Sequence, residues 1–193
     1  MGAVYALQND PRYAPKALMA RPVTSMRHVI AILLQNEAGA LSRVAGLFST
    51  RGYNIESLSV APTDDPTVSR LTLVTAGTDA VMTQIVSHIR KLIDVVQVED
   101  LTRGEHFERE LLLLKLKVTT SQLVPLTALV TECAGRILSG ALANFVIELT
   151  SSEAQVTRFI AQASQHGELL EVVRSGALGI THGTTTVTPF TAV

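Results

Sequence analysis

The residues with the clearest potential for chemistry form one short junction, Asn36-Glu37-Ala38-Gly39-Ala40-Leu41-Ser42. It follows an apolar segment and leads into a pattern typical of a helix, so its last residues would form a helix N-terminus. Such a terminus presents unpaired backbone N–H groups and partial positive charge, which suits a carboxylate. Gly39 lets the backbone approach a ligand closely, and Asn36 offers both a donor and an acceptor. The junction therefore suits a small zwitterion, although the same residue types also make a plain helix cap and turn.

Asn54 and Ile55 are the second group of residues expected at this site. They begin the next predicted strand, and in the expected topology we place them near the junction. The two groups together would offer polar recognition of a zwitterion beside an apolar wall.

Patterns typical of catalysis or of metal binding do not occur in the sequence. Gly39, Gly46 and Gly52 do not form the glycine fingerprint of a nucleotide-binding fold. The five histidines are scattered, and none lies at metal-ligand spacing from a Cys, Asp or Glu. Cys133 falls on a predicted apolar helix stripe, which indicates a small buried side chain rather than a nucleophile. These observations favour a binding protein over an enzyme.

The composition is that of a globular protein, since 47% of the 193 residues are hydrophobic and 17% are charged. A formal net charge of -1 favours neither nucleic acid nor an anionic membrane surface as a partner. No apolar run reaches the roughly 20 residues of a membrane-spanning helix. The single cysteine cannot form an internal disulfide, which fits a reducing, cytosolic compartment.

Residues 26–102 predict one domain with the element order β-α-β-β-α-β. The apolar run over 28–34 indicates a strand that is covered on both faces. A helix should then end at Gly52, and a strand over 54–60 should carry a bulge because Ile55 is out of phase. Alternation predicts a strand over 68–76, and a last strand ends near Leu101. The second helix is marked by the stripe Met82, Ile85, Val86, Ile89 and Ile93.

Residues 107–183 predict a second domain of the same order. Its strands are expected at 110–118, 137–142, 145–149 and 169–173. Its helix stripes are Leu126, Leu129, Val130 and Cys133, then Val156, Phe159, Ile160 and Ala163. The expected fold class is α+β, with two ferredoxin-like βαββαβ domains in tandem.

The two ends of the chain fall outside these domains. Residues 1–25 are interpreted as an N-terminal extension: a poorly ordered native arm, a lead upstream of a natural start at Met26, or an organelle transit segment. Residues 184–193 form a Thr-rich tail that we expect to be loosely held.

Four stretches after the first strand carry a family resemblance: 36–44, 46–48, 51–58 and 60–65. They resemble the ACT domain of acetohydroxyacid synthase (acetolactate synthase) small subunits, above all in Arg-Gly-Tyr-Asn-Ile-Glu-Ser-Leu at 51–58. The resemblance continues at Ser69-Arg70, Arg109-Glu110 and Arg174-Ser175-Gly176. It spans residues 26–183, so the first domain is identified as an ACT domain and the repeated topology gains support.

The resemblance implies a regulatory subunit with no catalytic residue and no cofactor of its own. Such subunits bind a catalytic large subunit, in which thiamine diphosphate, Mg and FAD are expected. They raise its activity and confer feedback inhibition by valine. They form homodimers side by side through their ACT sheets, with the effector at the shared interface. The positions that match the effector site are Asn36, Gly39, Ala40 and Leu41 from the first loop and helix, and Asn54, Ile55 and Val60 from the strand that follows. Because the resemblance implies a shared site, the two groups can come from different protomers.

Two other functions share parts of this pattern. A free-standing ACT domain that senses an amino acid and regulates another enzyme or transcription would use the same effector chemistry without the large subunit. A small enzyme on a ferredoxin-like scaffold would need an acid–base or nucleophile arrangement that the sequence does not present. Valine, leucine and isoleucine are not distinguished, because one methylene contributes only about 1–3 kcal/mol in an apolar pocket.

Overall fold

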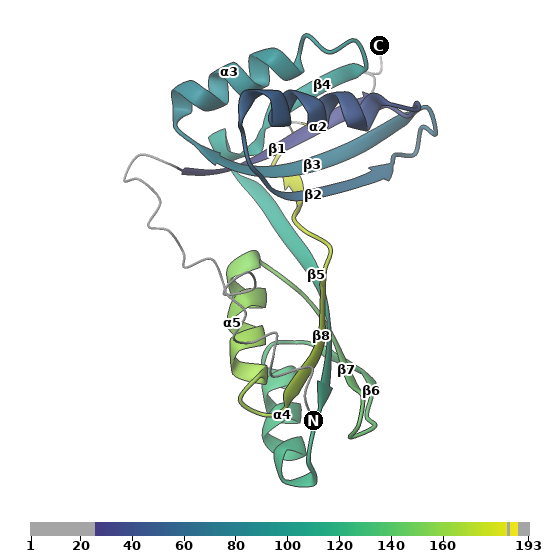
Figure 1. Ribbon diagram of the computed structural model, residues 1–193, viewed down its shortest axis with the longest axis vertical. Coiled ribbons are helices and arrows are strands. Elements are labelled where there is room, and N and C mark those ends of the chain that lie inside the picture. Colours follow the sequence, from purple (N-terminus) through teal and green to yellow (C-terminus); the bar gives the residue numbers. More distant parts are fainter. Residues whose placement is uncertain (1–25, 185, 189–193) are drawn as a thin grey trace.

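The computed structural model describes residues 26–184 and 186–188. The extension expected at 1–25 lies outside the described residues, as do residue 185 and residues 189–193 of the expected tail. Two domains lie at the ends of an elongated molecule, and strand β5 (His106–Lys117) runs from one to the other (Figure 1).

The N-terminal domain is a four-stranded antiparallel sheet with two helices on one face. Its elements are β1 (Met26–Gln35), α2 (Ala40–Arg51), β2 (Ile55–Pro62), β3 (Val68–Gly77), α3 (Asp79–Ile89) and β4 (Val95–Asp100). The strands lie in the order β2-β3-β1-β4, so β1 is central and β2 is an edge. Both helices cover the face on which β1 presents Ile30, Ile32 and Leu34. This arrangement confirms the predicted element order.

Helix α2 begins and ends close to where the sequence predicts. Ala40, Val44 and Phe48 recur every four residues and are buried against the sheet. Gly52 ends the helix with a φ of 68°, and its N–H donates to the carbonyls of Phe48 and Ser49. The helix therefore presents one apolar face and leaves its N-terminus free for another role.

Two details of this domain test the predicted pattern further. The bulge expected at the start of β2 is confirmed, since the register with β3 shifts between Ile55 and Ser57. The apolar stripe predicted for the second helix is confirmed as far as Ile89, but the prediction that it includes Ile93 is wrong. Helix α3 ends at Ile89 and the chain then turns, so Ile93 leaves the apolar face and is 88% exposed.

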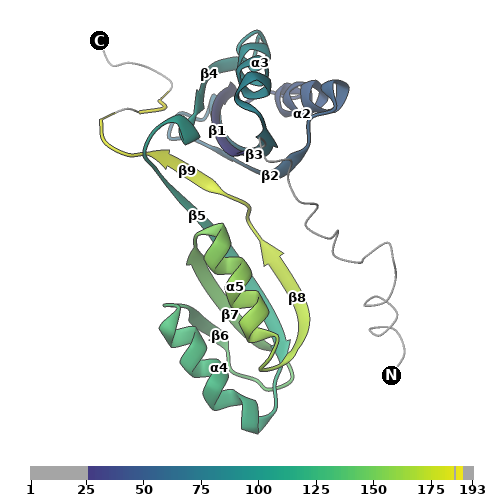
Figure 2. The same ribbon diagram turned by 90° about the vertical axis from the view of Figure 1, so that its left-hand side faces the viewer.

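The C-terminal domain repeats the order after a short 3-10 helix, η1 (Leu101–Arg103). Its further elements are α4 (Thr120–Glu132), β6 (Arg136–Ser139), β7 (Phe145–Ser151), α5 (Glu153–Ala163) and β8 (Glu168–Arg174). The strands lie in the order β6-β7-β5-β8, with both helices on one face (Figure 2). Two tandem ferredoxin-like domains are therefore confirmed. Within the described chain, no helix is long and apolar enough to cross a membrane.

One further strand, β9 (Leu178–Thr181), ties the domains together and is not predicted from the sequence. It pairs with the first part of β5, over His106–Arg109, and lies against the second face of the N-terminal sheet (Figure 2). The fit is close, because a Cβ at Gly179 would lie 2.7 Å from Leu101. The core on this face consists of Val29, Ala31, Leu33, Val68, Val74, Leu101, Ala177 and Val187. The expectation that the first strand is covered on both faces is confirmed.

Val187 departs from the expectation of a loosely held tail. Its side chain is buried in the core of the second face, and its carbonyl accepts a hydrogen bond from Nη1 of Arg70 at 3.1 Å. This part of the tail therefore helps to cover the N-terminal sheet.

Candidate effector site

The junction predicted to bind an effector lies at the exposed N-terminus of α2. Gly39 is the N-cap residue with a φ of 91°, in the left-handed region that favours glycine, and no side chain caps the helix there. The N–H of Ala40 donates to the carbonyl of Glu37 at 3.2 Å. The next N–H groups lie in the first turn, where the helix itself supplies no acceptor. The chain thus presents backbone donors and a partial positive charge at an exposed helix end.

Arg43 places a guanidinium paired with Asp94 at this helix end, a role that the sequence reasoning does not assign. Its guanidinium donates to Asp94 through Nε and through Nη2, the latter at 2.7 Å from Oδ1. The hydrogen bond from Arg43 lowers the pKa of Asp94, although burial of the carboxylate opposes this. A Cβ at Gly39 would lie 3.0 Å from Nη1 of the same guanidinium. The signal in the sequence is its spacing, because residues four apart on a helix are neighbours.

Asn36 is exposed and holds the junction against the turn before β3. Its Nδ2 donates to the carbonyl of Pro66 at 2.9 Å, and its backbone N–H donates to the carbonyl of Thr67 at 2.7 Å. Because Nδ2 is engaged in this way, the side-chain oxygen is better placed for a ligand. That oxygen accepts hydrogen bonds only, so it suits an ammonium group, while the second N–H of Nδ2 can still donate.

The expectation that Asn54 and Ile55 lie near the junction within one chain is wrong. Ile55 pairs with Thr75, which pairs with His28 near the start of β1, whereas the junction follows the end of β1 at Gln35. Helix α2 separates the two groups by its 12 residues, about 18 Å at 1.5 Å per residue. The physical reason is that the helix crosses the whole sheet before β2 begins. One copy of the chain cannot bring both groups to one small ligand.

Val60 lies at the same end of the sheet as the junction. It pairs with Leu71, which pairs with Ile32 late in β1. By alternation its side chain points to the same face as Leu58, which packs beneath the helices. The structure therefore groups Val60 with the junction and not with the start of its own strand.

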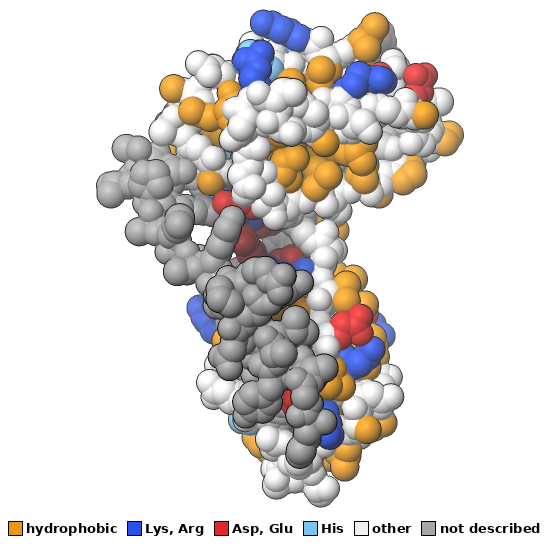
Figure 3. Space-filling model, viewed as in Figure 1, with side chains coloured by type: hydrophobic (Ala, Val, Ile, Leu, Met, Phe, Trp, Pro, Cys, Tyr) orange, Lys and Arg blue, Asp and Glu red, His pale blue; other side chains and the backbone are white. Residues whose placement is uncertain are grey.

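Apolar side chains are exposed over β2, as Figure 3 shows on the face that carries this strand. Val60 is 44% exposed and Leu41, on the adjacent helix, is 37% exposed; Ala61 and Pro62 are also exposed. In the described part of the chain β2 pairs with β3 and leaves its other edge unpaired. An apolar strand edge of this kind favours pairing with another chain.

In residues 26–184 and 186–188, no group of three or more His, Cys, Asp or Glu is placed to hold a metal ion. Cys133 is half-buried at the end of α4 and packs against the core of the C-terminal domain.

Comparison with known proteins assigns the family. The model described as AHAS small subunit-like ACT domain matches residues 30–97, and the model described as small subunit of acetolactate synthase matches 109–183. The acetolactate synthase isozyme 3 small subunit of Escherichia coli is 41% identical over 158 residues, which cover 82% of this chain and 97% of that one. The chain belongs to the acetolactate synthase small-subunit family. The Haemophilus influenzae acetolactate synthase small subunit is 42% identical, with the same two shares covered.

The fold of an acetolactate synthase small subunit extends over both domains of the chain. The crystal structure of the small subunit from Thermotoga maritima superposes with a TM-score of 0.74 at 28% identity, covering 83% of this chain and 99% of that one. The N-terminal domain is therefore an ACT domain. Membership of this family makes the chain a regulatory subunit of acetolactate synthase, in branched-chain amino-acid biosynthesis.

Proposed function

We propose that this subunit activates a catalytic large subunit and confers feedback inhibition by valine, which it binds between two copies of the chain. The family supports the partner and the pathway. The observation that carries the effector site is the exposed helix N-terminus at Gly39, with the guanidinium of Arg43 beside it. The subunit needs no cofactor for this role, and the thiamine diphosphate chemistry belongs to the large subunit.

A second copy supplies what one copy lacks. Strand β2 is an edge strand with exposed apolar side chains. When two copies pair antiparallel through β2, the start of each strand lies beside the end of the other. Asn54 and Ile55 of one copy then approach the junction and Val60 of the second. A two-fold axis makes this arrangement twice, so a dimer has two identical sites.

Valine fits such a site through each of its three groups. Its carboxylate accepts from the N–H groups of Gly39 and Leu41 and lies close to Arg43. Its ammonium group donates to the side-chain oxygen of Asn36. Its isopropyl group packs against Ile55 of the other copy, where apolar contact excludes water.

A site between two copies couples valine to the geometry of the dimer. Valine inhibits only to the extent that it binds one arrangement of the subunits more tightly than another. A pocket built from two copies meets this condition, because each arrangement of the copies changes the distance between its two halves.

The test is to reconstitute the subunit with the large subunit and to measure acetolactate formation with and without valine. Gly39→Asp is the informative variant, because it sets a carboxylate against the carboxylate of valine. Gly39→Ala is its matched control, since both variants strain the same φ of 91° and both place a Cβ 3.0 Å from Nη1 of Arg43. We expect Gly39→Asp to lower valine affinity about 100-fold or more, well beyond Gly39→Ala, and inhibition to be lost with it.

Two results would contradict the proposal. Unchanged valine affinity of Gly39→Asp by calorimetry would move the effector site elsewhere. A wild-type subunit that neither associates with the large subunit nor raises its activity would remove the regulatory role.

A further inference from the structure

The chain passes between the two domains twice, and both passages are tied to the N-terminal sheet. It leaves along β5 and returns through Ser175, Gly176 and Ala177 into β9. A cavity of about 320 Å³ lies at this waist between the domains. It is lined from both sides, among others by Arg27, Ser57, Glu110, Glu153 and Arg174. Acidic and basic side chains are visible at the waist in Figure 3.

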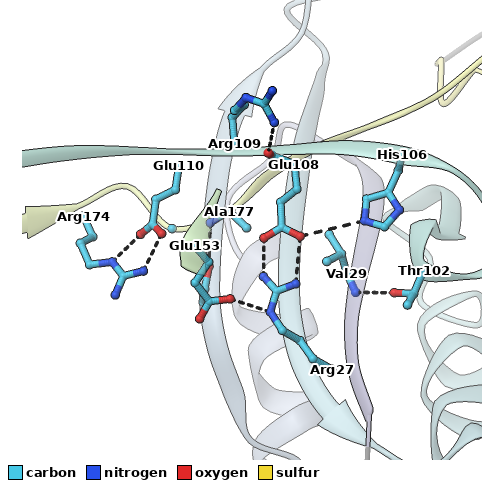
Figure 4. Close-up of polar contacts among 12 residues, drawn as sticks. Arg27, Val29, Thr102, His106, Glu108, Arg109, Glu110, Glu153, Arg174 and Ala177 are labelled. Carbon is cyan, nitrogen blue, oxygen red and sulfur yellow. Dashed lines mark hydrogen bonds and ion pairs between the residues drawn. The ribbon is translucent and has the colours of Figure 1, made fainter. Parts of the chain in front are cut away.

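Arg27, the second residue of β1, holds two carboxylates that belong to the other domain (Figure 4). Its Nη1 and Nη2 donate to Glu108 of β5 at 2.9 and 2.5 Å, and its Nε lies 2.8 Å from Glu153, the first residue of α5. Burial opposes the charge of this guanidinium, but hydrogen bonding and attraction to Glu108, then to Glu153, outweigh it and raise the pKa of Arg27. The planar guanidinium fixes direction as well as distance toward Glu108, whereas its Nε meets Glu153 as an ion pair without hydrogen-bond geometry. Arg27 therefore ties the start of α5 electrostatically to the N-terminal sheet.

Arg174 supports the same waist from within the C-terminal domain. Its Nε and Nη2 donate to the buried carboxylate of Glu110 at 2.7 and 2.6 Å (Figure 4). Glu153 also attracts Arg174 electrostatically. Glu153 thus lies in the field of two arginines, one from each domain, and contacts Arg27.

Ser57 of β2 fixes the returning passage. Its Oγ accepts a hydrogen bond from the N–H of Ala177 at 3.0 Å. Gly176 has a φ of 76°, and a Cβ there would lie 2.5 Å from the same Oγ, so the passage accepts only glycine without a shift. Any movement of Ser57 therefore acts directly on the segment that enters β9.

Ser57 is also two residues from the proposed valine pocket. Ile55, a proposed valine contact, and Ser57 flank the β-bulge at the start of β2. A bulge leaves a residue outside the regular ladder, so the strand can bend there without breaking its other pairs. Strand β1 gives a second connection between the waist and the other half of the pocket, because Arg27 lies near its start and the junction follows its end.

We propose that five residues at the waist, Arg27, Glu108, Glu153, Ser57 and Ala177, transmit valine occupancy at Ile55 to the orientation of the C-terminal domain. The proposal rests on the proposed function, because it needs valine to bind beside Ile55. Valine that packs on Ile55 shifts the bulge and Ser57, and with them the passage into β9. Because Arg27 holds the start of α5 in place, that shift rotates the C-terminal domain about this contact. Without Arg27 valine still binds, but its binding no longer favours one orientation.

The test uses full-length subunits reconstituted with the large subunit. Arg27→Met removes the contacts to both carboxylates, whereas Arg27→Lys keeps the charge without the planar fork. Lys115→Met is the matched control, because it removes a 2.7 Å ion pair to Glu171 that lies wholly within the C-terminal sheet. All three variants should bind valine as the wild type does by calorimetry on the free subunit. Arg27→Met should need about tenfold more valine for half-inhibition, Arg27→Lys less than that, and Lys115→Met no more than wild type.

A second measurement reads the orientation itself. One spin label is placed on Cys133, in the C-terminal domain, and a second on Gln84→Cys, an exposed position of α3 in the N-terminal domain. The distance between the labels reports the distance between the domains. Labelled chains are diluted with unlabelled ones, so that only distances within one chain are measured. Valine should shift this distance in the wild type and not in Arg27→Met. Even without valine, Arg27→Met should broaden the distance distribution, because the start of α5 is released.

Normal inhibition by valine in Arg27→Met overturns the proposal. So does a distance distribution in that variant that is as narrow as in the wild type, or that valine shifts as it does in the wild type. Loss of large-subunit activation by a folded Arg27→Met chain also overturns it, because the waist residues would then serve docking. Failure of the proposed function is a separate result, since it would show as absence of valine binding by the wild type.

Discussion

The two domains share one topology but cover their sheets differently. In the N-terminal domain the central strand β1 is buried on both faces, and Val29 to Leu34 are at most 2% exposed. Helices α2 and α3 cover one face, and β9 covers the other together with Ala177 and Val187. In the C-terminal domain the central strand β5 buries Leu112 and Leu114 beneath the helices, whereas Leu111 on the opposite face is 36% exposed. The same fold therefore gives one enclosed sheet and one sheet with a partly open face.

This difference arises from the path of the chain after β8 and not from the sequence pattern of β1 or β5. Strand β9 belongs to the C-terminal half of the sequence, yet it packs on the N-terminal sheet. Removal of the C-terminal half would therefore strip the cover from Val29, Ala31 and Leu33. A deletion of everything after Leu101 would therefore expose this core instead of separating the functions of the two domains.

The largest expected effect comes from truncating matched leucines on the second face of each sheet. Leu33→Ala should lower the free energy of unfolding by about 2–5 kcal/mol, because Leu33 is fully buried in the core on the second face of the N-terminal sheet. Leu113→Ala, on the partly open face of β5, should cost about 1 kcal/mol or less. Urea denaturation of both variants measures the difference. Similar losses at the two positions would show that the C-terminal face is as well covered as the N-terminal one.

A smaller effect is expected from adding one methyl group beneath β9. Gly179→Ala should lower the free energy of unfolding by about 1–3 kcal/mol, because its Cβ would lie 2.7 Å from the buried side chain of Leu101. Gly140→Ala is the control in the C-terminal domain, since a Cβ there meets nothing within 4 Å. A neutral Gly179→Ala by thermal denaturation would mean that β9 is not held against the N-terminal sheet.

The smallest effect concerns the response to acid. Hydrogen bonds from Arg43 and Lys115 lower the pKa values of Asp94 and Glu171, respectively. A carboxyl group whose pKa is lower in the folded state contributes stability above its unfolded pKa and loses it as the pH falls through the folded value. The free energy of unfolding should therefore fall below about pH 4.

The two ion pairs should contribute unequally to that fall. The side chain of Asp94 is 5% exposed and that of Glu171 is 56% exposed, so solvent screens the second pair more strongly. Arg43→Met should flatten the acid limb of the stability curve more than Lys115→Met does. Denaturation between about pH 3 and pH 7 measures this, and equal flattening would contradict the account.

Most elements could be predicted because their signals are local. The spacing of Ala40, Val44 and Phe48 and the stop at Gly52 define α2 within one stretch of chain. The bulge at Ile55 is visible as a break in alternation. Strand β9 has no such signal, since it is four residues long and its burial depends on contacts with β1 and Leu101. Its position is set by packing between distant segments.

The candidate site shows the same division. The helix N-terminus at Gly39 could be predicted, because a glycine before a helical pattern is a local signal. The separation of Asn54 from the junction could not, since it depends on how far α2 carries the chain across the sheet. The role of Arg43 was missed because its partner, Asp94, lies in the distant turn before β4.

The central claim is that valine binds a pocket completed by a second copy of the chain, and mixed dimers test it most directly. Gly39→Asp impairs one half of the pocket, and Asn54→Leu removes the amide from the other half. Each variant alone should lose valine binding by calorimetry.

Dimers that contain one chain of each variant can be purified through two different tags. In such a dimer one pocket carries both substitutions and the other carries neither. These mixed dimers should therefore regain wild-type affinity for valine at about half of their sites. Mixed dimers that bind no better than either variant alone would place the whole site within a single chain and contradict the account.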